Sequence, residues 1–382
     1  LIVPDLSNYK ILFFSQTPLC LPSQTATVSG IDICHPTIDN CDMSNLPKIG
    51  LDVGSAAIKV VELAPAGPGK WKLLTAASMA VADSGIVIGK TAVANAAGVI
   101  SKIMREAGTR GRLVVAALAE EQVSTHVVEM PVMNEGEIEQ ALGWQVEQYI
   151  PLPRDQAVWS WEIVKKDEVA GVMEVMLVAV AKSLAEWYRE VLEASGLEPV
   201  GLETELAATA RADVAADAPL SVIVDVGARS TDMGMVRGGQ LVFSRTVPTA
   251  GEAFTRAIES TLGLDPAQAE KYKNTYGFSA TELGGKLVEA MKPVMGLIAA
   301  EVRKTMDFYS SKHAGEVAKI VTLSGGVAVV PDVVGVLSAA LGMEVVVANP
   351  FARVELDGNQ EKALAGSEPF YAVAVGLAMK EV

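Results

Sequence analysis

Residues 49–63 read IGLDVGSAAIKVVEL, and residues 223–243 read IVDVGARSTDMGMVRGGQLVF. Both stretches begin with an apolar run that ends in Asp-Val-Gly, pass through a short loop of small and polar residues, and then enter a second apolar run. Apolar runs separated by such loops are typical of β-hairpins. The sequence therefore predicts one acidic hairpin built twice, as expected for a molecule of two related halves.

Strand and helix patterns alternate along the rest of the chain, which indicates an α/β protein. Residues 125–195 differ in character, with a helical pattern at 134–149, two alternating strand-like runs and a second amphipathic helix. We expect this segment to be an inserted α/β subdomain. The expected first lobe comprises residues 43–124 and 196–219, and a C-terminal helix at 366–382 packs back on it. The insert comprises residues 125–195. The expected second lobe comprises residues 220–365 and includes a helical part at about 251–314.

Length and charge limit the classes of function. A chain of 382 residues, half of them hydrophobic, is long enough for two domains with cores of their own. The net charge of −15 argues against binding to nucleic acid or directly to an anionic membrane surface, which both require basic residues. The longest apolar runs, such as residues 175–181, are far shorter than the roughly 18 residues of a spanning helix.

The first 42 residues do not resemble the body of the chain. All three cysteines (Cys20, Cys34 and Cys41) lie there, and Met43 is the first methionine. The segment has neither a sustained hydrophobic period nor the basic start of a signal peptide. We expect residues 1–42 to be a disordered or non-native extension. The cysteine-free body is compatible with the cytosol.

The two hairpins carry the residues of a predicted phosphate site. Gly54 and Gly227 follow strands, where glycine lets the backbone approach an anion and lets loop N–H groups point toward it. Asp52 and Asp225 would repel a phosphate, but two carboxylates facing each other could hold a hydrated magnesium ion through water. The duplication therefore predicts a magnesium nucleotide held between the two halves.

Three further groups have both a functional and an ordinary interpretation. Lys59 could neutralise a terminal phosphate, or it could be a solvated lysine on the outer face of a strand. Ser230, Thr231 and Asp232 could contact the ligand, or they could be ordinary turn residues.

The glycines of the LSGG motif at 323–326 could support a nucleoside, or they could form a simple turn. Glu270 and Lys273 share one face of a predicted helix, where they could hold the ribose and adenine or form a plain surface ion pair.

In combination and order, these motifs resemble the actin-like ATPase superfamily. The chain is most similar to the PilM members of its FtsA/PilM branch, through EMPVMNEGEIEQALGWQVEQYIPLP at 129–153, VDVGARSTDMGMVRGGQLVFSRTVPTAG at 224–251, EVRKTMDFY at 301–309, LSGGVAVVP at 323–331 and VVVANPF at 345–351. The resemblance implies an α/β actin-like fold, a duplicated ribonuclease H-like two-lobe ATPase with an α/β subdomain inserted in the first lobe. It further implies ATP and Mg²⁺ as cofactors and weak ATPase activity at most.

The resemblance also assigns roles to individual residues. Glu205 matches an acid on a connecting helix that orients metal-bound water, and with Asp225 it would be catalytic. Asp52 and Asp225 would hold Mg²⁺ through water. The cofactor-binding set is Gly54, Ser55, Ala56, Lys59, Gly227, Ser230, Thr231, Glu270, Lys273, Gly325 and Gly326. The chain departs from many relatives at Ala228-Arg229, where they have Gly-Gly. A positive φ at either position would weaken phosphate contact, whereas the Arg229 side chain could itself reach the phosphates.

The insert is the expected partner-binding part. Its aromatic residues Trp144, Tyr149, Trp159 and Trp161 could form a small core of their own or line an apolar groove for a peptide. The resemblance implies a groove between the first lobe and residues 125–195 that takes the N-terminal cytoplasmic tail of a PilN-like inner-membrane protein. It implies a cytoplasmic adaptor of type IV pilus assembly and twitching motility, peripheral at the inner face of the membrane and attached to it indirectly.

Other partners and roles remain open. Pilus motor ATPases and further copies of the chain are possible partners. The alternatives in function are an FtsA-like division or filament protein and, behind it, a sugar kinase of the same fold.

Overall fold

The computed structural model describes residues 46–81, 86–279, 281–313 and 315–381. The prediction for residues 1–42 lies outside the described residues. The described chain contains a six-stranded, a five-stranded and a three-stranded sheet.

The first sheet has the strand order β14-β3-β2-β1-β4-β8. Its strands are β1 (Lys48–Val53), β2 (Ala57–Gly67), β3 (Lys70–Ala80), β4 (Leu113–Leu118), β8 (Glu198–Thr204) and β14 (Val354–Glu355). The first three form an antiparallel meander, and β4 and β8 continue the sheet in parallel with β1.

The second sheet repeats this arrangement in the order β11-β10-β9-β12-β13. Its strands are β9 (Ser221–Val226), β10 (Thr231–Arg237), β11 (Gln240–Val247), β12 (Val321–Ser324) and β13 (Val345–Val347). Again three strands form an antiparallel meander, and two parallel strands follow on the other side of the first. The repeated hairpin seen in the sequence therefore belongs to a repeated five-stranded unit.

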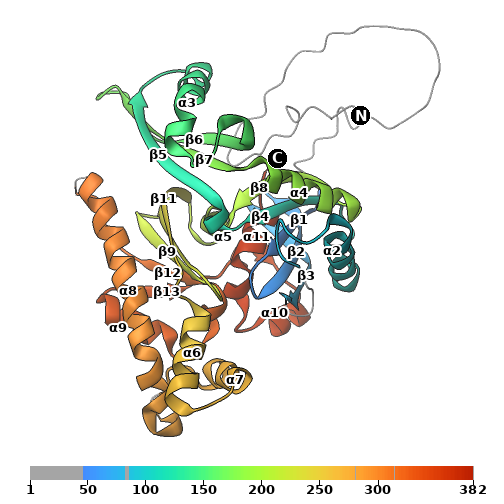
Figure 1. Cartoon of the computed structure of the whole chain (residues 1–382), viewed down its shortest axis with the longest axis vertical. Helices are drawn as coiled ribbons and strands as arrows, with labels where there is room; N and C mark the ends of the chain where they lie inside the picture. Colours follow the sequence, from blue (N-terminus) through green and yellow to red (C-terminus); the bar gives the residue numbers. More distant parts are fainter. Residues whose placement is uncertain (1–45, 82–85, 280, 314, 382) are drawn as a thin grey trace, which may run out of the picture.

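Two helices join the halves at the centre of the molecule (Figure 1). α5 (Glu205–Asp213) packs against α11 (Ala372–Ala378), which lies on β1 of the first sheet, while α5 also contacts β9–β11 of the second. The contacts are close because both helices are built from small residues. A Cβ on Gly50 of β1 would lie 1.9 Å from the carbonyl oxygen of Ala374, and one on Gly376 would lie 1.9 Å from that of Ala208.

The remaining helices cover the sheets. They are α2 (Val93–Ala107), α4 (Lys182–Ala194), α6 (Gly251–Leu262), α7 (Pro266–Tyr276), α8 (Lys286–Lys312), α9 (Val333–Leu341) and α10 (Gly358–Leu364). In Figure 1, α6, α7 and the start of the long α8 form the end of the molecule farthest from the three-stranded sheet, and the other end of α8 extends back toward that sheet. None of the helices within the described ranges is both long and apolar enough to cross a membrane.

The three-stranded sheet has the order β5-β7-β6 and is built from residues between β4 and α4. Its elements are β5 (Val123–Pro131), α3 (Glu135–Tyr149), β6 (Ala157–Asp167) and β7 (Val172–Ala181). α3 begins at a capping box between Asn134 and Glu137. Its apolar face covers one side of the sheet, and the other side of β7 joins the main core through Met176 and Val178.

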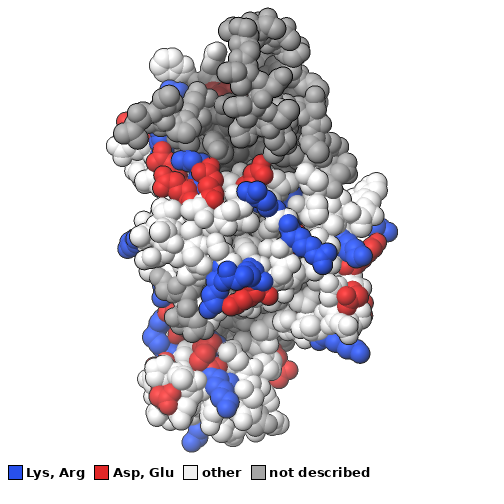
Figure 2. All heavy atoms as spheres, turned by 90° about the vertical axis from the view of Figure 1, so that its right-hand side faces the viewer, with Lys and Arg blue, Asp and Glu red and all other residues white. Residues whose placement is uncertain are grey.

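The lobe boundaries given by the sequence analysis stay predictions. Two observations bear on them. α4, expected within the insert, contacts α2 and β8 as well as β7. The C-terminal helix spans Ala372–Ala378, shorter than the expected 366–382, because a 3₁₀ turn at Glu368–Tyr371 precedes it. On the face of the molecule seen in Figure 2, the described Lys and Arg side chains are interspersed with Asp and Glu, as on an ordinary solvated surface.

Candidate functional site

The two hairpins have the same geometry. The Gly54 N–H donates to the carbonyl of Ala57 at 3.1 Å, and the Gly227 N–H donates to that of Ser230 at 3.0 Å. In the strand register Asp52 lies opposite Lys59, and Asp225 lies opposite Asp232. The two copies therefore differ in one decisive position, which is a cation in the first hairpin and a carboxylate in the second.

Lys59 lies near carboxylates of both lobes. Its Nζ lies 2.8 Å from Asp52 Oδ2 and 4.5 Å from the centre of the Phe370 ring, and its side chain is only 13% exposed. Burial alone would lower the pKa of Lys59, but the nearby carboxylates of Asp52, Asp225 and Glu205 together raise it. These contacts exclude the alternative of a solvated lysine on an outer face.

Several carboxylates gather around this lysine. Glu205 begins α5 directly after its N-cap residue Thr204. Burial raises the pKa of Glu205 well above its ordinary value, and the neighbouring charges of Asp52, Asp232 and Asp225 raise it further. Acids from both lobes are thus close enough to oppose each other's ionisation. A cation that bound among these carboxylates would therefore be stabilised.

Glu120 is a member of this group that the sequence analysis did not single out. It begins a 3₁₀ turn directly after β4, and its carboxylate accepts the N–H of Leu206 in α5 at 3.0 Å. Burial raises its pKa to about 8, and Asp232 adds to the shift. The available signal was its position: an acid at the carboxyl end of a buried strand parallel to β1 lies at the same sheet edge as Asp52.

The end of β12 lies against Asp225. Ser324 Oγ donates to Asp225 Oδ2 at 2.8 Å. Gly325 has φ +85°, and a Cβ there would lie 2.6 Å from Asp225 Oδ1, so only glycine fits. At Gly326, by contrast, a Cβ would have no neighbour within 4 Å. The LSGG motif therefore supports Asp225 and leaves open space beside it.

The second loop is held by its own side chains. Asp232 accepts hydrogen bonds from Ser230 Oγ at 2.9 Å and from Thr246 Oγ1 at 2.6 Å. Thr231 is fully buried, and its hydroxyl donates to the carbonyl of Thr249 at 2.6 Å. Contact of Thr231 with a nucleotide stays a prediction, because in this structure its hydroxyl holds the loop.

The tips of the two loops differ in character. In the first loop Ser55 and Ala56 are exposed small residues, and the Ala56 carbonyl accepts the N–H of Val81 at 2.8 Å. In the second loop neither Ala228 nor Arg229 has a positive φ; among the described non-glycine residues only Leu283 and Asp332 do. Replacing Gly-Gly by Ala-Arg therefore introduces no backbone strain.

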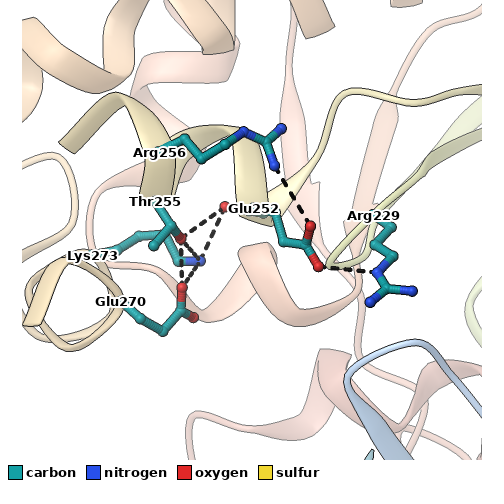
Figure 3. Close-up of polar contacts among 7 residues, drawn as sticks. Arg229, Glu252, Thr255, Arg256, Glu270 and Lys273 are labelled. Atoms are coloured by element: carbon teal, nitrogen blue, oxygen red, sulfur yellow. Dashed lines mark hydrogen bonds and ion pairs between the residues drawn. The ribbon is translucent and has the colours of Figure 1, made fainter. Parts of the chain in front are cut away.

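A second polar cluster lies between α6 and α7 (Figure 3). Lys273 is 5% exposed, and its Nζ donates to Glu270 Oε2 at 2.6 Å, to Thr255 Oγ1 at 3.0 Å and to the carbonyl of Gly251 at 3.2 Å. These contacts exclude a plain surface ion pair. Glu270 also lines a pocket of about 400 Å³ that Glu252, Thr255 and Arg256 of α6 share with the start of α7.

One carboxylate oxygen beside Lys59 is available to a hydrated cation. Within the described ranges, no group of three or more His, Cys, Asp or Glu side chains is placed to hold a metal ion. Asp52 Oδ1, however, is buried without a hydrogen-bond partner, which leaves an acceptor for metal-bound water. Magnesium commonly takes one or two carboxylates and completes its shell with water and phosphate.

Comparisons with known proteins agree with this architecture. Residues 50–382 match the family described as type IV pilus assembly protein PilM. A solved PilM–PilN type IV pilus biogenesis complex contains a chain that is 29% identical, with a TM-score of 0.75 over 88% of this chain and 98% of that one.

Two more distant structures show the fold alone. They are the ethanolamine utilization protein EutJ of Carboxydothermus hydrogenoformans, with 17% identity, a TM-score of 0.53 and coverage of 87% and 89%, and a nucleotide-free diol dehydratase-reactivating factor, with 12%, 0.51 and coverage of 87% and 98%. The predicted α/β actin-like fold is confirmed.

Proposed function

The chain belongs to the PilM family of type IV pilus assembly proteins, and from this premise we propose that it is an ATP-binding adaptor that holds the cytoplasmic tail of a PilN-like membrane protein. One observation carries the nucleotide half of this proposal. Lys59 of the first lobe interacts electrostatically with Asp52 and Glu205 of its own lobe and with Asp225 of the second. Charged groups of both lobes therefore lie near Lys59.

In this proposal Mg²⁺–ATP bridges the two hairpins. Asp52 and Asp225 would bind the water shell of the ion, and Lys59 would neutralise the terminal phosphate. The N–H groups of the loops at Gly54 and Gly227 would face the other phosphate oxygens. The ribose and base would lie in the pocket beside Glu270, next to the ion pair of Glu270 with Lys273. Bound in this way, the nucleotide would draw the lobes together.

The chemistry of Glu205 favours slow hydrolysis. A water-activating base has to be ionised, yet burial and the surrounding acids raise the pKa of Glu205 well above its usual range. A bound cation would oppose this shift. We therefore infer that Glu205 orients water efficiently only when Mg²⁺ is bound near it.

The partner half rests on the relative of known structure and on the insert. That relative is part of a PilM–PilN complex. In this chain β6 is an edge strand of the three-stranded sheet, with Trp159 and Trp161 only partly buried against the α3 side. An extended tail could bind to the edge of such a sheet, with its side chains beside these aromatic rings. The protein would be cytoplasmic and would reach the membrane through this tail.

Two measurements test the proposal. Isothermal titration of the full chain with Mg²⁺–ATP should give saturable binding that Asp225→Asn strongly weakens, with unchanged binding of the tail peptide in the absence of nucleotide as evidence of folding. A peptide of a PilN-like cytoplasmic tail should bind the ATP-loaded protein. Absence of magnesium-dependent nucleotide binding would overturn the first half, and absence of tail binding would overturn the second. ATP-dependent light scattering would instead favour a filament-forming protein.

A further inference from the structure

Arg229 occupies the tip of the second loop, at the position that Ala56 occupies in the first. The loop is tied to the first turn of α6, because the Gly227 carbonyl accepts the N–H of Gly251 at 3.0 Å and the Ala228 carbonyl accepts that of Glu252 at 2.8 Å. The backbone of the loop is therefore fixed, whereas the Arg229 side chain is 69% exposed and can change partners.

Arg229 belongs to a short chain of charges that leads to the pocket. Its Nε donates to Glu252 Oε1 at 3.1 Å, and Glu252 Oε2 lies 3.6 Å from Arg256 Nη1. Figure 3 shows Arg229 on the opposite side of Glu252 from the cluster of Thr255, Glu270 and Lys273. A ligand that extended from the pocket past Glu252 would reach Arg229.

The charges around Lys59 and around Glu252 favour Arg229 as the group that binds an anion. Several carboxylates surround Lys59, and Lys59 itself is already paired with Asp52. Arg229 and Arg256 both pair with the carboxylate of Glu252, so this group of three carries one more positive than negative charge. Glu259 and Glu270 line the adjacent pocket. The ion pairs there are solvent-exposed, so exchanging Glu252 for another anion costs little. A phosphate offers a guanidinium several oxygens in a favourable bidentate geometry.

From this arrangement we propose that Arg229 lets the second loop distinguish a nucleoside triphosphate from a diphosphate, by exchanging Glu252 for oxygens of the terminal phosphate. Glu252 is then the competitor that holds the arginine when this phosphate is absent. The inference rests on the proposed function, since it requires a nucleotide bound between the two hairpins. It goes further by naming the residue that distinguishes a triphosphate from a diphosphate.

The test compares dissociation constants of the full chain for Mg²⁺–ATP and Mg²⁺–ADP by isothermal titration. Arg229→Gln should weaken ATP binding about tenfold and ADP binding by no more than about twofold, so that the preference for ATP largely disappears. Arg229→Lys should lie between, because it retains the charge without the bidentate geometry. Glu252→Gln should strengthen ATP binding, because it removes the competing carboxylate.

Arg229→Gln and Glu252→Gln should change the affinity for ATP in opposite directions, which separates this role of Arg229 from a structural one. If Arg229 only clamps the start of α6, Arg229→Gln and Glu252→Gln will both weaken ATP and ADP to the same degree, and the inference is overturned. An unchanged ratio of ATP to ADP affinity in Arg229→Gln overturns it as well. Arg245→Gln is the matched control, because Arg245 forms a comparable pair with Glu301 at 2.6 Å outside the loop and pocket. If the wild type binds neither nucleotide, the proposed function itself fails.

Discussion

Glu120 illustrates how a single buried carboxyl makes the molecule sensitive to pH. Burial raises its pKa to about 8 in the folded chain, whereas an exposed glutamate releases its proton near its ordinary pKa of 4.5. Between these two pH values the native state retains a proton that the unfolded state has lost. Stability therefore decreases as pH rises through this window.

We predict that Glu120→Gln flattens this pH dependence. Glutamine imitates the protonated acid and retains an oxygen that can accept the Leu206 N–H. Thermal unfolding without nucleotide or divalent cations should show the wild type losing more stability than the variant between about pH 5 and 8, by a few kcal/mol. The neighbouring, exposed Glu121→Gln should follow the wild type. Parallel curves for Glu120→Gln and wild type would contradict the role assigned to Glu120.

At the residue scale, the sequence identified the charged members of the hairpins but not how they are used. Whether Lys59 is solvated or buried depends on Phe370, which follows it by more than 300 positions. The same holds for Glu270 and Lys273: an i,i+3 pair of equal length joins Glu301 to Lys304, yet Lys304 is 62% exposed. Spacing predicts that such residues meet, and only packing decides whether water surrounds them.

At the scale of elements, periodicity located the hairpins and the longer helices, because each buries one face. It did not single out β8, whose Pro199 and Gly201 obscure the strand pattern. The position of β8 explains this, since it is an edge strand of the first sheet, where proline is tolerated. β13 and β14 are too short to show any period. The close contact of α11 with α5 likewise has no local signature.

We predict that Gly376→Ala tests this contact. The new Cβ would meet the carbonyl oxygen of Ala208, a backbone atom that cannot move aside, so the variant should lose about 3 kcal/mol in its free energy of unfolding. Gly98→Ala in α2 is the matched control, because its Cβ would have no neighbour within 4 Å. It should gain about 0.5–1 kcal/mol from helix propensity. Urea denaturation measures both changes, and similar values for the two variants would contradict a tight α5–α11 contact.

At the scale of the whole molecule, the insert rests on both lobes. Besides the apolar side of β7, a polar bridge joins it to the second lobe. Lys165 of β6 lies 3.6 Å from Glu316, which also pairs with Arg237 of β10. Glu174 of β7 lies 3.4 Å from His313 at the end of α8. The sequence predicted an insert but not this second attachment, because no pattern relates its surface charges to residues more than 100 positions away.

The bridge gives the second lobe a direct influence on the proposed partner site. We predict that Glu316→Gln reduces the effect of nucleotide on tail binding, because Lys165 of the insert and Arg237 of the second lobe lose their shared anion. The ratio of the tail's dissociation constants without and with Mg²⁺–ATP, measured by titration, should move toward one by about threefold or more. Lys166→Gln is the control, since Lys166 pairs with Glu168 inside the same hairpin at 3.0 Å and should leave the ratio unchanged. A full nucleotide response in Glu316→Gln would contradict this role and would leave the apolar face of β7, the Glu174–His313 contact and the hydrogen bond from Gln240 to the Ile163 carbonyl as the remaining attachments of the insert.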